Sequence, residues 1–216
     1  THFPHDLTLG EEDETDMGTM QRILADREGI YWTIDGLDGT QNWELGTTFG
    51  GMVARRKGNE ILYAAVFQPM DEHVYGAGFF EAEKGCGAWR WYDEETHIQI
   101  LAAQENALKR RFVMIEGSSS KSFKNARVVK LGQRVSTRTN VSSCFSTTIV
   151  ASGLASGMLV IENPPWDTWP ALLFIPEAGG IVTDWDGKPV TPANCGRIIA
   201  AGNEIDHDIF LELLTP

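Results

Sequence analysis

The sequence predicts a layered α/β protein, on the evidence of two hydrophobic patterns and a globular composition. Up to about residue 104, short β-branched and aromatic runs alternate with glycine-containing turns, which predicts an antiparallel meander. From residue 105, strand-like and helix-like segments alternate, as in layered sheets and helices. The chain has 216 residues, 42% hydrophobic and 22% charged, enough for one sizeable domain or two closely packed smaller ones.

The first part is expected to begin with a polar acidic loop and a short helix or turn. Runs of Val, Ile, Tyr, Phe and Trp then predict strands, with turns at KGNE and PMDE and at glycines further on. The expected helix or turn is residues 20–28, and the expected strands fall within residues 29–35, 49–78 and 79–100.

The second part is expected to alternate strands and helices. Glycines end two of the helices, as at many helix C-termini. The expected strands are residues 111–117, 158–163, 180–184 and 197–202, and the expected helices are residues 120–132, 143–157, 166–180 and 206–214.

The charge of the chain excludes some partners. A formal net charge of -12 repels nucleic-acid backbones and anionic membranes, and the chain has no basic stripe, which argues against a nuclease. No apolar run approaches the roughly 18 residues of a membrane span, and no signal peptide is expected. Three scattered cysteines without a C-x-x-C pair fit a reducing compartment, so we expect buried, inert thiols and a cytoplasmic protein.

The segment WTIDGLDGTQNW, residues 32–43, places Asp35 and Asp38 at the end of a predicted strand. Both carboxylates can reach one side of a turn, and the Leu37 carbonyl can point the same way. Either a metal or a proton compensates their repulsion, or they face apart in solvent. Carboxylates, carbonyls and water are the ligands of hard cations such as Mg²⁺. Such a cluster could hold two or three metals that polarise a phosphate.

The residues that follow add a possible phosphate site. Gly39 lets a ligand approach the backbone closely, and the amides of Gly39 and Thr40 at a helix N-terminus would favour an anion. The Thr40 hydroxyl could orient a water. Together these features suggest metal-assisted phosphate chemistry.

Further acidic residues are Glu11 and Glu12 in the segment LGEED, and Asp167 in PPWDTW. Each has an ordinary alternative explanation. The Glu pair suits a solvated acidic loop, the DGLDGT segment suits a pair of turns, and Asp167 suits the N-cap of a helix.

In combination these motifs resemble the inositol monophosphatase superfamily. The resemblance rests on three segments, which are GEE, then WTIDGLDGTQNW, then WDTWPALLFIPEAGG, in this order. It covers nearly the whole chain. It implies a phosphomonoesterase with an α/β/α/β/α sandwich fold whose N-terminal helices are missing from this chain. It also implies two or three Mg²⁺ per site, inhibition by lithium and a homodimer.

The resemblance also implies roles for single residues. Glu11, Asp35 and the Leu37 carbonyl would bind a first metal, and Asp35, Asp38 and Asp167 a second. Gly39 and Thr40 would hold the phosphate, and Thr40 would orient a metal-activated water that attacks phosphorus. Glu12 would support the ligands or hold a third metal. The active site would lie between residues 1–104, with most ligands, and residues 105–216, which supply Asp167.

The chain departs from the family pattern in places. Gly36 replaces the usual proline, which should loosen the loop, and Trp169 and Pro170 replace small residues and should reshape the wall of the site. The acidic partner of the Thr40 hydroxyl would lie upstream of residue 1.

The substrate is less closely defined than the reaction. Ser143 and Glu162 are the candidates for substrate contacts. We expect a small polyol or sugar phosphate. The alternatives are fructose 1,6-bisphosphate, histidinol phosphate or 3'-phosphoadenosine 5'-phosphate as substrate, or a non-catalytic relative that binds metal or phosphate.

Overall fold

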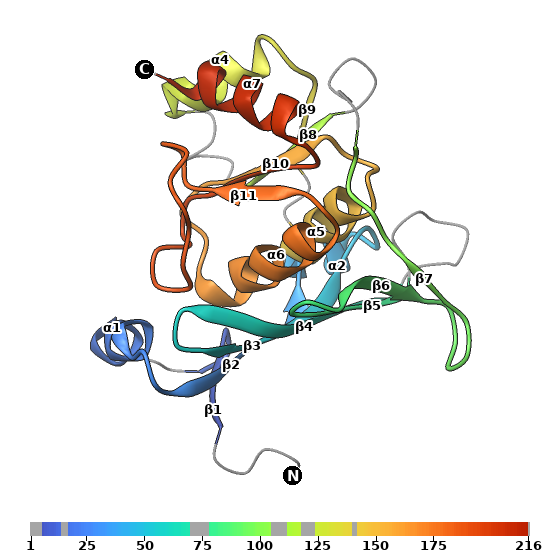
Figure 1. Cartoon of the computed structure of the whole chain (residues 1–216), viewed down its shortest axis with the longest axis vertical. Coiled ribbons are helices and arrows are strands. Elements are labelled where there is room, and N and C mark those ends of the chain that lie inside the picture. The colour runs from blue at the N-terminus through green and yellow to red at the C-terminus, as the bar shows by residue number, and fades with distance from the viewer. Residues whose placement is uncertain are drawn as a thin grey trace.

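A computed structural model of the chain describes residues 6–13, 17–69, 78–104, 112–117, 124–139 and 142–215. Its elements form successive layers (Figure 1): helices α4 (Ala126–Gly132) and α7 (Glu204–Leu214), a five-stranded sheet, helices α5 (Ser143–Ala151) and α6 (Pro165–Glu177), and a seven-stranded sheet. The predicted layered α/β fold is thus confirmed. In the described part of the chain, no helix is long and apolar enough to cross a membrane.

The larger sheet contains its strands in sequence order, and all neighbours are antiparallel except β1 and β2. The meander predicted for the first part of the chain is therefore present, and β1 is an addition that the sequence did not suggest. The strands are β1 (Leu7–Gly10), β2 (Ile30–Asp38), β3 (Gly50–Lys57), β4 (Glu60–Gln68), β5 (Gly78–Glu83), β6 (Gly87–Trp91) and β7 (His97–Gln99).

The smaller sheet has the order β11-β12-β10-β8-β9, with β8 parallel to both of its neighbours and the remaining pairs antiparallel. Four of its strands match predicted ones, while β9 was not foreseen. The strands are β8 (Val113–Glu116), β9 (Thr137–Thr139), β10 (Gly157–Val160), β11 (Ile181–Thr183) and β12 (Ile199–Ala201).

The helices cover the sheets, and polar side chains cap the N-termini of α4, α5 and α7. Asn125, Ser142 and Asn203 accept hydrogen bonds from the first amides of α4, α5 and α7. The helices are α1 (Met17–Ala25), α2 (Thr40–Glu44), α4 (Ala126–Gly132), α5 (Ser143–Ala151), α6 (Pro165–Glu177) and α7 (Glu204–Leu214). The predicted helix over residues 120–132 falls partly outside the described residues.

The start of helix α6 contradicts the alternative explanation of Asp167 as the N-cap of a helix. The helix begins at Pro165, with Pro164 as its N-cap residue, so Asp167 lies inside the first turn and is not the cap. Proline is tolerated at the first helical position because the amide there has no intrahelical acceptor. The capping explanation of Asp167 is therefore wrong.

The main core lies between the larger sheet and helices α5 and α6. Arg56 is fully buried there, with its guanidinium 4.8 Å from the Tyr31 ring centroid and 5.1 Å from that of Trp169. The Trp169 indole also donates a hydrogen bond to the Pro192 carbonyl, at 3.0 Å. Trp169 thus joins α6 to the sheet. The expectation that Trp169 and Pro170 reshape the wall of the site was wrong, because both are buried away from the cavity described below.

The cysteines follow the prediction in part. All three are free, and Cys144 and Cys195 are buried. Cys86 is exposed in the turn after β5, which corrects the expectation of a buried thiol at that position.

Candidate active site

A cavity of about 310 Å³ lies where the two sheets and the helices between them meet. Its walls come from the end of β1, the C-terminal half of β2, the start of α2, the end of β8, and the first turns of α5 and α6. The described residues that line it are Glu11, Asp35, Leu37, Asp38, Gly39, Thr40, Gln41, Glu116, Gly117, Ser143, Asn163 and Asp167.

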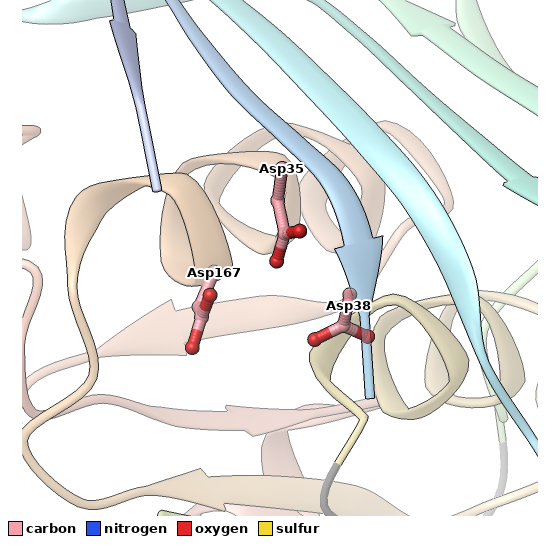
Figure 2. A group of neighbouring side chains, drawn as sticks. All are labelled: Asp35, Asp38 and Asp167. Carbon is pink, nitrogen blue, oxygen red and sulfur yellow. The ribbon is translucent and has the colours of Figure 1, made fainter. Parts of the chain in front are cut away.

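Three aspartates meet in this cavity. Asp35, Asp38 and Asp167 each offer a carboxylate oxygen, and these oxygens lie within 4.8 Å of one another. Figure 2 shows the three carboxylates around one shared space, two from β2 and one from the first turn of α6. Oxygens this close can bind a common cation.

An irregularity in β2 brings Asp35 and Asp38 to the same face of the sheet. Side chains alternate along a regular strand, so residues three apart would point to opposite faces. Here Asp35 pairs with Met52 but Asp38 pairs with Gly50, so β2 contains one extra residue between them. Such a bulge re-aims the side chains that follow it, and both carboxylates are therefore buried on the inner face.

The residue of β3 that pairs with Asp38, Gly50, must be a glycine for this packing. A Cβ atom on Gly50 would lie 2.4 Å from the Phe67 carbonyl oxygen and 2.9 Å from Cys144 Sγ. No real side chain fits at these distances, so Gly50 allows β3 and β4 to approach α5 beneath the Asp38 carboxylate.

The N-terminus of α5 holds the Asp38 carboxylate in place. Asp38 Oδ2 accepts hydrogen bonds from the Ser142 hydroxyl at 2.7 Å and from the Cys144 amide at 2.9 Å. Asp38 Oδ1 accepts one from the Ser143 amide at 3.1 Å. Hydrogen bonds to a charged acceptor are stronger than neutral ones, so Asp38 is fixed before any ligand binds.

Burial and mutual repulsion raise the pKa values of other carboxyl groups in the cavity. Burial, then the charges of Asp38 and Glu11, raise the pKa of Asp35 to about 7. Burial, then the charges of Asp38 and Asp35, raise the pKa of Asp167 to about 8. A charged carboxylate is costly in such a place unless a positive charge compensates it.

The donor set fits a hard divalent cation. The described lining contains five carboxylates, Glu11, Asp35, Asp38, Glu116 and Asp167, and no Lys, Arg or His. No protein cation among these residues therefore offsets the negative charge. Clustered carboxylate oxygens are the ligands that Mg²⁺ prefers.

The remaining residues predicted from the β2 segment also lie at the cavity. Leu37, Gly39 and Thr40 line it, and the Thr40 hydroxyl donates to the Leu37 carbonyl at 3.2 Å. Glu11 lines it as well, from the end of β1, where its amide donates to the Ile34 carbonyl at 3.1 Å. Glu12 is exposed and lies outside the described lining.

The two predicted substrate contacts are placed differently from each other. Ser143 lines the cavity at the start of α5. Glu162 does not belong to the described lining; it has a positive φ of 59° and forms an ion pair with Arg197.

Four residues of the described lining were missed by the sequence analysis: Gln41, Glu116, Gly117 and Asn163. Glu116 ends β8, is only 2% exposed, and accepts a hydrogen bond from the Ser146 hydroxyl. Asn163 donates from Nδ2 to Ser143 Oγ at 3.1 Å. The signal for Glu116 was present, because it lies at the end of a predicted strand and directly precedes a glycine, as Asp35 does.

The glycines of the β2 segment allow a paired prediction on stability. Gly36 has no positive φ, and a Cβ there meets no atom within 4 Å, so Gly36→Ala should stabilise the fold by about 0.4–1 kcal/mol. Gly39 has a φ of 81°, so Gly39→Ala should cost about 1–2 kcal/mol. Thermal unfolding of both variants checks this, and a lower midpoint for Gly36→Ala than for Gly39→Ala would contradict it.

Fold and site together define a class, a layered α/β protein with a buried cluster of carboxylates able to hold a divalent cation. More specifically, the chain belongs to the inositol monophosphatase family, because the model described as "Inositol monophosphatase family" matches residues 1–215. The members of this family are phosphoric monoester hydrolases. The resemblance inferred from the three motifs is thereby confirmed.

Individual relatives agree with this assignment. The chain is 29% identical to a fructose-1,6-bisphosphatase/inositol-1-monophosphatase of Aquifex aeolicus, covering 98% of this chain and 74% of the relative. It is 32% identical to an inositol-1-monophosphatase of Rhizobium meliloti, covering 91% and 69%. The fold matches the inositol monophosphatase structure from Anabaena with a TM-score of 0.79 at 23% identity, over 99% of this chain and 79% of that one.

Proposed function

We propose that the chain is a Mg²⁺-dependent phosphomonoesterase that hydrolyses the phosphate ester of a small polyol or sugar. The observation that carries the proposal is the group of three aspartate oxygens within 4.8 Å of one another. It lies in the same cavity as Gly39 and Thr40, the residues proposed to hold phosphate. Family membership supports the reaction class, and the local chemistry supports the metal.

The residues would divide the work as follows. Asp35, Asp38 and Asp167, with Glu11, would hold two or three Mg²⁺. When bound, the metal polarises the phosphate and lowers the pKa of a water. The amides of Gly39 and Thr40, at the start of α2, would donate hydrogen bonds to the phosphate, since the first helical amides have no intrahelical acceptor.

The other residues would hold the reacting groups in position. The Thr40 hydroxyl would orient the attacking water, and its present partner is the Leu37 carbonyl, a proposed metal ligand, at 3.2 Å. The hydrogen bonds from the start of α5 to Asp38 would keep its carboxylate from moving as charge develops on the oxygens of the reacting phosphate. Water attacks directly in this scheme, so no phosphorylated protein side chain forms.

The test is phosphate release with and without Mg²⁺ from four compounds. These are inositol 1-phosphate, fructose 1,6-bisphosphate, histidinol phosphate and 3'-phosphoadenosine 5'-phosphate. We expect Mg²⁺-dependent turnover, fastest for inositol 1-phosphate. The Aquifex relative is named as both a fructose-1,6-bisphosphatase and an inositol-1-monophosphatase, so fructose 1,6-bisphosphate is the first alternative substrate. Metal binding without turnover of any compound would favour the non-catalytic relative instead.

Four further properties remain predictions for this chain. Inhibition by lithium can be measured in the same assay, and the homodimer by analytical ultracentrifugation. The cytoplasmic location and the lack of nucleic-acid and membrane partners rest on the net charge of -12 and on the sequence patterns.

A further inference from the structure

A buried arginine packs against α6, the helix that carries Asp167. Arg56 of β3 is fully buried, and no other Arg or Lys in the described part of the chain is buried. None of the ion pairs among the described residues includes it, and its Nε has no hydrogen-bond partner. Burying such a charge without a carboxylate costs free energy, so the groups around Arg56 must compensate it.

Two carbonyl oxygens and two aromatic rings surround the guanidinium. Its terminal nitrogens donate to the carbonyls of Ile23 in α1 and Gly58 in the β3–β4 turn, the latter at 3.0 Å. Its central carbon lies 4.8 Å from the ring centroid of Tyr31 and 5.1 Å from that of Trp169. A cation over an aromatic face is attracted more strongly where water is excluded. Arg56 thus joins α6 to α1, to β2 and to the β3–β4 turn.

Trp169 connects this arginine to the candidate cation site. It lies two residues after Asp167 on α6, is fully buried, and donates from its indole to the Pro192 carbonyl at 3.0 Å. Successive helical residues are about 100° apart around the axis, so residues two apart point to nearly opposite sides of a helix. Asp167 faces the other two aspartates (Figure 2), while Trp169 contacts Arg56 and Pro192. The position of the indole therefore sets the direction of the carboxylate.

The first turn of α6 is held weakly by its own backbone. Pro170 has no amide hydrogen, so the Trp166 carbonyl lacks the usual bond from the residue four positions later. The N-cap residue, Pro164, provides no side-chain cap, and the Thr168 hydroxyl bonds locally to its carbonyl at 3.0 Å. The contacts of Trp169 therefore contribute more to the direction of this turn than they would in a regular helix.

We propose that Arg56 is a positioning residue for the cation site, which acts through Trp169 to hold the first turn of α6 and the Asp167 carboxylate in place. Arg56 is outside the described lining of the cavity, so it is neither a metal ligand nor a substrate contact. The inference rests on the proposed function, in which Asp167 binds Mg²⁺ with Asp35 and Asp38. Replacing a residue that orients a metal ligand typically lowers metal affinity by about tenfold to a hundredfold.

The test measures Mg²⁺ binding by isothermal titration calorimetry to the unaltered chain, Arg56→Met and Arg56→Lys. Methionine removes the charge, and lysine keeps the charge but lacks the flat guanidinium that stacks on the rings. We expect both variants to raise the Mg²⁺ dissociation constant about tenfold, because each frees Trp169. A buried positive charge by itself repels a divalent cation, so an electrostatic effect alone would instead give tighter binding in Arg56→Met.

A milder variant and a matched control separate positioning from a general loss of packing. Trp169→Phe keeps an aromatic ring beside Arg56 and removes the bond to Pro192, so it should raise the dissociation constant by a smaller factor. The control is Phe174→Leu, at a fully buried position of α6 about two turns after Asp167. It should lower the midpoint of thermal unfolding and leave the Mg²⁺ dissociation constant within about twofold.

Binding and turnover test the two proposals separately. Mg²⁺ binding without phosphate release from any compound would contradict the proposed function, and the binding comparison would still decide the role of Arg56. Phosphate release with an unchanged Mg²⁺ dissociation constant in both Arg56 variants would overturn the inference and leave the function in place. Tighter binding in Arg56→Met, or an equal loss of affinity in Phe174→Leu, would also overturn it.

Discussion

Asp38→Asn should lower Mg²⁺-dependent phosphate release at least about a hundredfold and also destabilise the fold by about 1–3 kcal/mol. The loss of activity follows because an amide oxygen is a weaker cation ligand than a carboxylate. The loss of stability follows from three donors, the Ser142 hydroxyl and the Ser143 and Cys144 amides, that converge on the two Asp38 oxygens. An amide has one acceptor oxygen, so its NH₂ group would face a donor.

Phosphate release and thermal unfolding measure the two effects separately. Asp186→Asn is the control, because Asp186 is exposed and its contact with Arg127 at 3.8 Å is a surface ion pair of little energy. Ser142→Ala keeps the Asp38 charge and removes one donor, so it should retain most activity and lose part of the stability. Activity of Asp38→Asn within tenfold of the unaltered chain would remove Asp38 from the proposed site.

The order of elements was predictable because their patterns are local. The β3–β4 hairpin and helices α5 and α7 follow from alternating or continuous apolar runs and from nearby turn or capping residues. Strand β1 has only four residues, Leu7–Gly10, and pairs in parallel with β2 more than twenty residues later. Such pairing depends on distant contacts and leaves little signal in the segment itself.

The candidate site was predictable where its residues are adjacent in sequence. Asp35, Leu37, Asp38, Gly39 and Thr40 reach one cavity from a single segment, and motif resemblance added Glu11 and Asp167. The bulge that turns both aspartates to one face was not predictable, because it depends on how β2 pairs with Gly50 and Met52 of β3.

Sequence spacing alone could not show which glutamate lines the cavity on the side of the smaller sheet. Glu162 lies nearer to Asp167 in sequence than Glu116 does, yet its backbone has a φ of 59° and its side chain pairs with Arg197. Glu116 reaches the cavity because β8 lies beside β10 in the smaller sheet and α5 supplies Ser146. The pairing of strands in the smaller sheet therefore decides which of the two glutamates lines the cavity.

Asp167→Asn should remove activity as completely as Asp38→Asn, yet stabilise the metal-free protein by on the order of 1–3 kcal/mol at pH 8.5. Burial, with the charges of Asp38 and Asp35, raises the Asp167 pKa from 3.8 to about 8. A folded-state pKa above the unfolded one means that stability is greatest below about pH 4 and is lost as the pH rises toward 8. The asparagine never ionises, so it escapes this loss.

The sign of the effect is tested by thermal unfolding of both proteins at pH 5 and pH 8.5, with chelator and with Mg²⁺. In chelator, the midpoint of Asp167→Asn should exceed that of the unaltered chain by more at pH 8.5 than at pH 5. Mg²⁺ should reverse the order, because the cation stabilises the ionised carboxylates and binds the folded state alone. A difference that does not respond to pH in chelator would contradict the repulsion among Asp35, Asp38 and Asp167. A difference unchanged by Mg²⁺ would contradict the metal site itself, since the same three oxygens would then hold no cation.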